Sequence, residues 1–384
     1  MKKKILFLIL GISFGYSRLL VNIGIDGGAY YMQNKLGSLN TITADLAYEA
    51  RLASIFSLFG YYQIYYSGTG FGSSVEPVFS ERYQDHFMTV KGEFRIKDKI
   101  FLRPFISGLL EYYRYGKNEA WGKGLYDFFS LGAGLEHEYR IGDLLTLSAG
   151  ARYQEFRYPN YTDLFLLYIS RLDESPSENF RSLSCDAGIK EIKAKKIFFA
   201  SAKYQYSLRY YVTKKVIRSD GYHYAEHEQS SVHHLEMLPG IRLRAMLFRL
   251  ELFGDLLDSN QNLLSGTSLL NTAFYSDYFD YTLYGMRPQL AFYIKKHTLG
   301  INCGYAYKKY QARPAQQSDG SYFPSRLYIR LLSAGIEMNI AAGKYLSVIP
   351  DYIFAWSSSN SKYLAAGGLA YQAHVLSIKL LFHY

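Results

Sequence analysis

The sequence predicts an all-β fold, a single closed antiparallel β-barrel of about sixteen strands that crosses a membrane. Three observations predict it. Apolar and polar residues alternate in segment after segment, which is the period of a strand with two unlike faces. The connections between these segments alternate between short and long. The chain also ends inside such a segment, on Tyr384.

The composition narrows the class of protein. The chain has 384 residues, enough for one large β domain or two ordinary domains. It contains 39 Tyr and 25 Phe, and tyrosine, with an apolar ring and a polar tip, suits strands and the membrane–water boundary. Only 9 Pro argue against a disordered chain. Mean hydropathy is −0.12, and no segment after the N-terminal leader has the pattern of a membrane-spanning helix.

The first seventeen residues predict a secretory signal peptide. Three lysines precede an apolar run from Ile5 to Phe14, and a small-x-small cleavage site follows at residues 15–17. We therefore expect residues 1–17 to be removed and residues 18–384 to form one barrel domain. Loss of the three lysines lowers the formal net charge from +10 to +7. Because the remaining charges are scattered, nucleic acid is not expected as a partner.

Sixteen segments carry the alternation, and the clearest lies between Met88 and Ile96. The first eight predicted strands are Val21–Ile25, Leu39–Leu52, Ile55–Tyr66, Met88–Ile96, Ile100–Tyr115, Phe129–Arg140, Leu144–Tyr158 and Phe180–Ala194. The second eight are Ile197–Thr213, Ser231–Leu243, Leu247–Asp258, Asp277–Ile294, Thr298–Arg313, Ser325–Ile340, Tyr345–Ser357 and Leu364–Tyr384. Fourteen strands is the alternative, because the second segment and the turn at Arg244 are weakly marked.

The lengths of the connections support a membrane barrel over a soluble sandwich. Short turns rich in Gly, Asp and Lys alternate with longer loops, as short periplasmic turns and long external loops do in membrane barrels. A soluble sandwich would mix loop lengths without this regularity. The predicted long loops are Ser67–Arg82, Gly116–Lys123, Pro159–Asn179, Lys214–Ser230, Ser259–Ser276 and Pro314–Pro324.

An internal repeat and four prolines add detail. Residues 206–222 match residues 305–322 at an offset of 99, and both copies place Ser-Asp-Gly, a turn sequence, in a predicted loop. Pro104, Pro239, Pro288 and Pro350 fall inside predicted strands. Because proline cannot donate a ladder hydrogen bond, we expect a bulge or a break in the ladder at each.

The last strand carries the strongest local signal. Its apolar residues fall at every second position, and it ends on an aromatic residue; they are Leu376, Ile378, Leu380, Phe382 and Tyr384. This pattern resembles the C-terminal strand of bacterial outer-membrane β-barrels, porin-like proteins in which it is the recognition signal for insertion. The resemblance implies an outer membrane of a Gram-negative cell, with outer-membrane lipid and the barrel-assembly machinery as partners. The last strand should pair with the opening strand around Val21–Ile25, leaving no free edge.

The polar faces of the strands carry charges of both signs, which in a barrel would line a wet lumen. The predicted lumen-lining residues are Lys91, Glu93, Arg95, Glu136, Glu138, Arg140, Arg152, Lys203, Arg209, Glu236, Arg242, Arg249, Glu251, Lys308, Glu337 and Lys379. A slight cationic excess predicts at most a weak preference for anions. A water-filled pore and a lumen closed by salt bridges both fit this pattern.

Three further groups of residues have alternative interpretations. Pairs of tyrosines near the long loops predict an interfacial girdle, although sugar-stacking platforms would look the same; the pairs are Tyr30 and Tyr31, Tyr65 and Tyr66, Tyr112 and Tyr113, and Tyr210 and Tyr211. The His-rich loop 223–234 favours a solvated polar loop over a metal site, because it has neither a helical pattern nor cysteines. The apolar loop 159–179 either enters the lumen or extends a strand. Cys185 and Cys303 fall on lipid-facing positions and should stay unpaired.

These observations predict a porin-like passive channel for small hydrophilic solutes, with no cofactor. One alternative is a surface-structural or adhesion barrel with a blocked lumen, and another is a barrel that exports a polysaccharide or other polymer. No GxSxG, HExxH or paired-carboxylate motif is present, so no enzyme is predicted. A barrel protease resembling the omptins stays open as an alternative, but such barrels have fewer strands than this length suggests.

Overall fold

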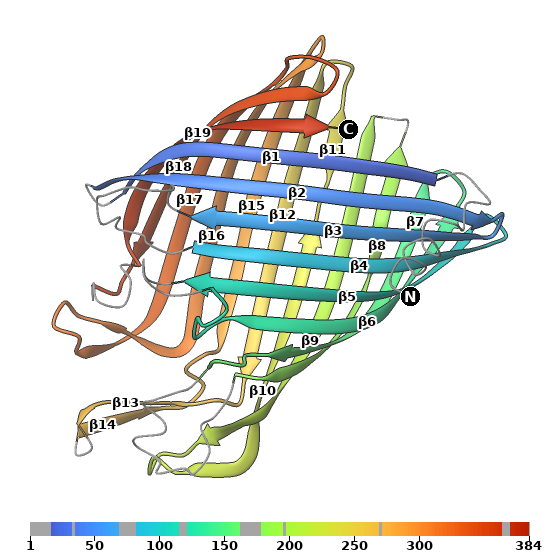
Figure 1. The fold of residues 1–384 in the computed structure, drawn as a ribbon. Helices are drawn as coiled ribbons and strands as arrows, with labels where there is room; N and C mark the ends of the chain where they lie inside the picture. Colours follow the sequence, from blue (N-terminus) through green and yellow to red (C-terminus); the bar gives the residue numbers. More distant parts are fainter. Residues whose placement is uncertain are drawn as a thin grey trace.

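The computed structural model describes residues 17–32, 35–68, 82–114, 121–161, 178–194, 197–268, 271–362 and 369–383. Among these residues no helix is long and apolar enough to cross a membrane. The predicted signal peptide, the final Tyr384 and most of the apolar loop 159–179 lie outside the described residues. The described chain is built almost entirely from long antiparallel strands (Figure 1).

The strands follow one another along the chain as follows. The first nine are β1 (Ser17–Met32), β2 (Lys35–Ala53), β3 (Phe56–Gly68), β4 (Arg82–Ile96), β5 (Ile100–Arg114), β6 (Phe128–Ile141), β7 (Leu145–Arg157), β8 (Phe180–Ala194) and β9 (Phe198–Ile217). The others are β10 (His223–Met237), β11 (Gly240–Arg242), β12 (Met246–Ser259), β13 (Leu263–Ser268), β14 (Asn271–Tyr275), β15 (Tyr281–Ile294), β16 (His297–Gln316), β17 (Tyr322–Ala341), β18 (Leu346–Ser359) and β19 (Tyr371–His383).

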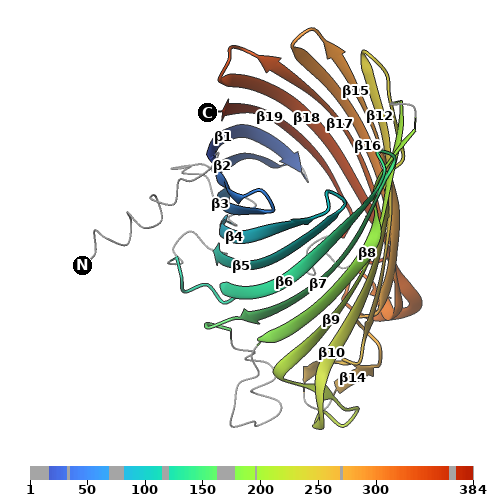
Figure 2. The same ribbon diagram turned by 90° about the vertical axis from the view of Figure 1, so that its right-hand side faces the viewer.

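The strands close into one barrel. Each barrel strand pairs with the next barrel strand along the chain, with β15 following β12, and β1 pairs with β19 in antiparallel register, with Ile23 opposite Phe382 and Ile25 opposite Leu380. Figures 1 and 2 show β1 and β19 side by side. β10 and β11 both lie between β9 and β12 and form one strand interrupted at Pro239, so the described residues make a closed antiparallel barrel of sixteen strands. The predicted fold and strand number are confirmed.

The barrel has two unlike ends, which we call the turn end and the loop end. At the turn end, neighbouring strands are joined by tight connections such as residues 97–99, where Lys97 and Asp98 both adopt positive φ. At the loop end, β13 and β14 form a separate hairpin beside the tip of β10 (Figure 1). The alternation of short and long connections thus follows the prediction in general.

Three of the predicted long loops are wrong in large part, because they contain strands, and Ser259–Ser276 holds the separate β13–β14 hairpin. Most of Lys214–Ser230, with the His-rich loop 223–234, belongs to β9 and β10, and most of Pro314–Pro324 belongs to β16 and β17. These two hairpins end in matching tips: the amide of Arg218 donates to the carbonyl of Tyr222 at 2.8 Å, and the amide of Gln317 donates to that of Ser321 at 2.8 Å. Gly221 and Gly320 supply the positive φ of the two tips. The repeat at an offset of 99 is therefore structural.

Asparagines from a later strand hold each long hairpin. Asn260, after β12, accepts a hydrogen bond from the amide of Gln229 at 2.7 Å. Asn360, after β18, accepts one from the amide of Tyr328 at 3.0 Å. Each asparagine also donates from Nδ2 to a carbonyl two residues earlier, at His227 or Arg326. These clamps satisfy backbone groups where the regular ladder ends.

The prolines interrupt the ladder as predicted. Pro239 separates β10 from β11, and the pairing of β15 with β16 skips Arg287 and Pro288. The pairing of β4 with β5 likewise skips the residues opposite Arg103 and Pro104. The β17–β18 ladder is broken near Pro350 in the same way. At Pro104, Pro288 and Pro350 the ladder on the other side of the same strand is unbroken, whereas at Pro239 both ladders are interrupted.

Side chains alternate between the two faces of the sheet. The outward face carries exposed apolar residues, and on β19 these include Leu376, Ile378, Leu380 and Phe382. Cys185 and Cys303 are exposed on this face and are not bonded to each other, as predicted. The prediction that both tyrosines of each pair join an interfacial girdle is only half right, because adjacent residues of a strand face opposite ways. Tyr31 points outward and is 46 % exposed, whereas Tyr30 points inward and is buried.

Candidate functional site: the charged inner wall

The register places all sixteen predicted lumen residues on the face opposite the exposed apolar side chains. Two ion pairs show that this face is the concave one. Lys91 on β4 reaches Glu136 on β6 at 2.8 Å, across β5. Lys190 on β8 reaches Glu138 on β6 at 2.7 Å, across β7. Side chains two strands apart converge in this way only on the inside of a curved sheet.

Glu138 is the centre of an ionic layer near the turn end. Arg103 donates to it at 2.8 Å, Lys190 at 2.7 Å and Arg140 at 3.1 Å, and only 2 % of Glu138 is exposed. Arg103 also donates from Nε to Glu93 at 2.7 Å. This layer extends around the wall from β4 to β8.

Aromatic rings on the inner wall lie under basic side chains. Phe101, which is 2 % exposed, has the guanidinium groups of Arg140 at 4.1 Å and of Arg95 and Arg103 at 5.4 Å from its ring centre. The same arrangement recurs along the wall, as cation–π contacts that help to hold a basic side chain in place. These further pairs are Arg152 on Phe105, Arg209 on Phe180, Arg242 on Phe199, Arg287 on Phe253 and Lys308 on Tyr281.

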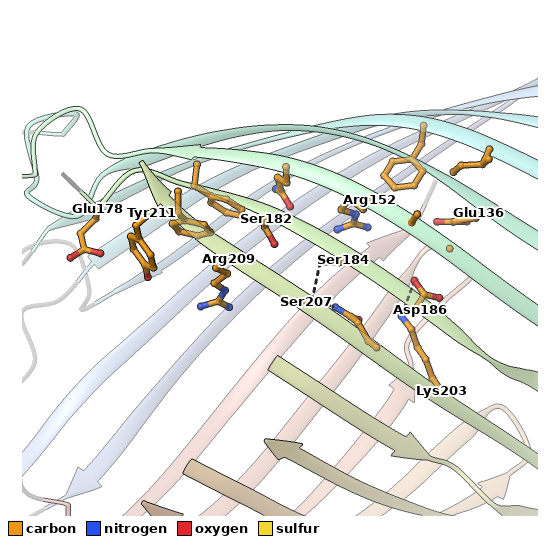
Figure 3. Close-up of a pocket in the computed structure, with 18 of the residues that line it drawn as sticks. Glu136, Arg152, Glu178, Ser182, Ser184, Asp186, Lys203, Ser207, Arg209 and Tyr211 are labelled. Atoms are coloured by element: carbon orange, nitrogen blue, oxygen red, sulfur yellow. Dashed lines mark hydrogen bonds and ion pairs between the residues drawn. The ribbon is translucent and has the colours of Figure 1, made fainter. Parts of the chain in front are cut away.

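A cavity of about 580 Å³ lies against the inner wall between β5 and β9 (Figure 3). Its charged residues are Glu136, Arg152, Glu178, Asp186, Lys203 and Arg209. Serine and glutamine side chains fill the space between them, and the hydroxyls of Ser184 and Ser207 are 2.8 Å apart. Five aromatic rings form its wall toward the loop end, with Phe156 stacked on Phe180 at 4.3 Å.

The two arginines of this cavity lie against aromatic rings, Arg152 on Phe105 and Arg209 on Phe180. Within the described ranges, neither Arg152 nor Arg209 has a carboxylate oxygen within 4.0 Å. Lys203 touches Asp186 only at 4.0 Å. In Figure 3 the side chains of Arg152, Arg209 and Lys203 project from the same side of the sheet. Each of the two guanidinium groups could therefore donate two hydrogen bonds to an anionic group that enters the cavity.

The opposite part of the wall is more evenly balanced. Glu251 accepts a hydrogen bond from Arg287 at 2.7 Å, and Arg249 donates to Gln289. His234 lies 2.5 Å from Asp255 through Nδ1 and 3.7 Å from Glu236 through Nε2. Glu337 shares a small hollow with Arg249.

Sequence reasoning missed two basic residues of the wall, Arg103 and Arg287. Each directly precedes a proline within its strand, Pro104 or Pro288, and the expected break in the ladder at the proline obscured the alternation of faces. Counting parity along each strand would have found both, since Arg103 lies two residues before Phe105 and Arg287 two before Gln289, all on the inner face. In the described part of the chain, no group of three or more His, Cys, Asp or Glu residues is arranged to hold a metal ion.

The ion pairs run around the wall and not across it. In the described chain, each inter-strand pair joins strands that are neighbours or next but one, such as β5 with β6 or β6 with β8. Ion pairs therefore link neighbouring strands around the described part of the wall. None of the pairs among these residues bridges opposite sides of the barrel.

No protein-family model matches the sequence, and no curated protein matches it. Solved structures similar to it include OmpT, an outer-membrane protein of Vibrio cholerae, with a TM-score of 0.48 and 10% identity over 96% of this chain and 99% of that one. A variant of the ferric enterobactin receptor PfeA from Pseudomonas aeruginosa has a TM-score of 0.47 and 8% identity over 96% and 81%. A bacterial polysaccharide outer-membrane secretin has a TM-score of 0.44 and 9% identity, over 95% of this chain and 98% of that one. The chain thus resembles bacterial outer-membrane β-barrels, but these likenesses carry no assignment of function.

Proposed function

We propose that this chain is an outer-membrane β-barrel that acts as a porin-like passive channel for small hydrophilic solutes. The proposal takes residues 1–17 as the signal peptide, the turn end as periplasmic and the loop end as external. It also takes Leu376, Ile378, Leu380, Phe382 and Tyr384 as the signal that the barrel-assembly machinery reads. Barrels of about sixteen strands are wide enough to enclose water.

The direction of the ion pairs is the observation that carries the proposal. A lumen closed by salt bridges needs pairs that span it, whereas the inter-strand pairs among the described residues follow the wall. Arg152 and Arg209 line the cavity, and among the described residues neither forms an ion pair with a carboxylate. Because an isolated charge is stable only where water or a ligand can solvate it, these arginines favour a wet interior.

Conductance across a planar lipid bilayer tests the proposal. The refolded full chain should insert and produce stepwise increases in current, with a step size that scales with the salt concentration. A barrel that inserts but gives no step at any voltage would contradict the proposal. Folding is checked beforehand by the shift in gel mobility between unheated and boiled samples, so that an absence of current steps is not confused with failure to fold.

A second candidate, a surface-binding platform, is favoured by the structure of the loop end. Lys214 pairs with Glu178 at 2.8 Å and with Glu228 at 3.3 Å, and Glu228 is buried. Gln261, which is also buried, donates to Glu228 at 2.8 Å and fixes this cluster to the β12 connection. A buried polar cluster of this kind holds the β9–β10 hairpin rigid above the barrel. Deleting residues 263–275 should abolish partner binding under this candidate, whereas it should leave conductance intact if the channel proposal holds.

The proposal includes no catalytic step and no cofactor. The His–Asp pair on the wall, His234 with Asp255, has Glu236 near its second ring nitrogen. A histidine held between two carboxylates is not turned toward a nucleophile, as a general base would need to be. In the proposal, His234 links β10 to β12 through the hydrogen bond between its Nδ1 and Asp255.

A further inference from the structure

Two basic side chains lie on the outward, apolar face of the barrel, at the level where it meets the loop end. Lys309 pairs in register with Thr282, the second residue of β15. Arg330 pairs with Ser358, the last but one residue of β18. Toward the turn end, the next outward residues on the same strands are aromatic or apolar, Tyr307 on β16 and Leu332 on β17. Both charges therefore lie at the boundary between the apolar band and the long hairpins.

Lys309 and Arg330 border one hollow on this face. The hollow is also lined by Tyr284, Tyr305, Tyr307 and Trp356. The rings of Tyr284 and Tyr307 are 5.4 Å apart, and Arg330 lies 5.0 Å from the ring of Tyr328. Aromatic rings thus form the floor of the hollow, and two cations form its rim.

Within the described ranges, neither cation has a carboxylate within 4.0 Å. Another outward arginine, Arg157 on β7, is paired with Glu155 at 2.9 Å. A basic group beside hydrocarbon is costly unless it reaches water or an anion. Two such groups above an aromatic floor match a ligand with a phosphate at one end and acyl chains at the other.

We propose that this hollow binds the phosphate group of an anionic lipid in the leaflet next to the loop end. Lys309 and Arg330 hold the phosphate, and Tyr307 and Trp356 pack against the acyl chains. The inference rests on the membrane insertion that the proposed function includes. It does not depend on an open lumen, so failure of one proposal is distinguishable from failure of the other.

Trp356 reports directly on the hollow, because the chain has only 2 Trp and the other is Trp121. The full-length W121F variant is refolded into phosphatidylcholine vesicles containing either brominated phosphatidylglycerol or brominated phosphatidylcholine, and the quenching of Trp356 is measured. The anionic lipid should quench at a lower mole fraction, by about fivefold for each basic side chain. Equal midpoints for the two brominated lipids would overturn the proposal.

Charge variants in the W121F background separate this site from general attraction to an anionic membrane. The pair of substitutions K309Q and R330Q should abolish the preference, whereas R181Q, which removes an outward arginine on β8, should keep it. A preference that survives the double substitution also contradicts the proposal. Excess inorganic phosphate should not displace the lipid; if it restores Trp356 fluorescence, the hollow binds free phosphate instead. All variants are compared at equal heat-shifted gel mobility, so that an unfolded sample is not scored.

Discussion

Arg103 on β5 donates from Nη1 to Oε2 of Glu138 on β6 at 2.8 Å, and Nε of the same guanidinium donates to Glu93 on β4 at 2.7 Å. One arginine thus links three consecutive strands, at the position where the ladder between β4 and β5 is interrupted beside Pro104. The ionic layer replaces, on the inner side, part of the connection that the backbone loses. Its stabilising effect should therefore be measurable.

Replacing Glu138 with glutamine should lower the free energy of unfolding. The carboxylate accepts hydrogen bonds from three cations, and hydrogen bonds to charged groups contribute roughly 1.5–3 kcal/mol. We expect the lower end of that range, because Arg140 and Lys190 are about half exposed and water screens them. Urea unfolding in lipid vesicles gives the value. The control E136Q removes only the ion pair between Glu136 and Lys91. Because Glu136 is more exposed than Glu138, this substitution should cost less than about 1 kcal/mol.

Neighbouring residues on β8 should differ in their access to water. Ser184 lines the inner cavity and Cys185 lies on the outward face. In a chain with both native cysteines replaced by serine, S184C should react with a charged, water-soluble methanethiosulfonate reagent. The native Cys185, tested in a C303S chain, should react at least about tenfold more slowly, since a charged reagent does not enter the apolar band. Equal rates for the two thiols would contradict the assignment of faces.

Neutralising the two unpaired arginines of the cavity should change ion selectivity. Arg152 and Arg209 contribute positive charge to the inner wall without a carboxylate beside them in the described chain. The double variant R152Q/R209Q should shift the reversal potential in a salt gradient toward cations, while steps of current persist. The shift should shrink as ionic strength rises, because salt screens charges that face water. R181Q on the outward face is the matched control and should leave the reversal potential unchanged.

The alternation of residues could be predicted from the sequence because it is local. A period of two assigns each residue of a strand to one face, and the register of β6 against β7 follows from Gly142 and Asp143 at their turn. The same rule, applied strictly, would have divided the tyrosine pairs such as Tyr30 and Tyr31 between the two faces. That error came from reading the pairs as one girdle.

The long hairpins could not be predicted in the same way, because distant residues decide them. Lys214, Lys215 and the Ser-Asp-Gly tip have the composition of a loop. Lys214 and Lys215 nevertheless continue β9, and the hairpin is held by Asn260, which accepts the amide of Gln229 and donates to the carbonyl of His227. Likewise, the cavity depends on which charges of four strands remain unpaired, and a single strand pattern does not contain that information.

Asp280, in the connection before β15, should make the stability of the loop end depend on pH. Burial, together with the nearby carboxylates of Asp258 and Asp277, raises the pKa of Asp280 to about 6. Its carboxyl also accepts the amide of Ser259 at 2.7 Å. The pKa of Asp280 in the folded chain thus lies above its unfolded value of about 3.9. The stabilising contribution of the protonated carboxyl is therefore complete below the unfolded pKa, and it is lost as the pH rises through the folded pKa of about 6.

The substitution D280N should therefore raise the urea midpoint at pH 7 and flatten its rise between pH 7 and pH 5. An amide at this position still accepts from Ser259 and carries no charge, so the gain at pH 7 should be no more than about 1 kcal/mol. D258N is the second variant: it keeps Asp280 but removes the neighbouring charge, and should move the pH transition to lower pH. If D280N retained the full pH dependence of the parent chain between pH 5 and 7, another group would have to be responsible for it.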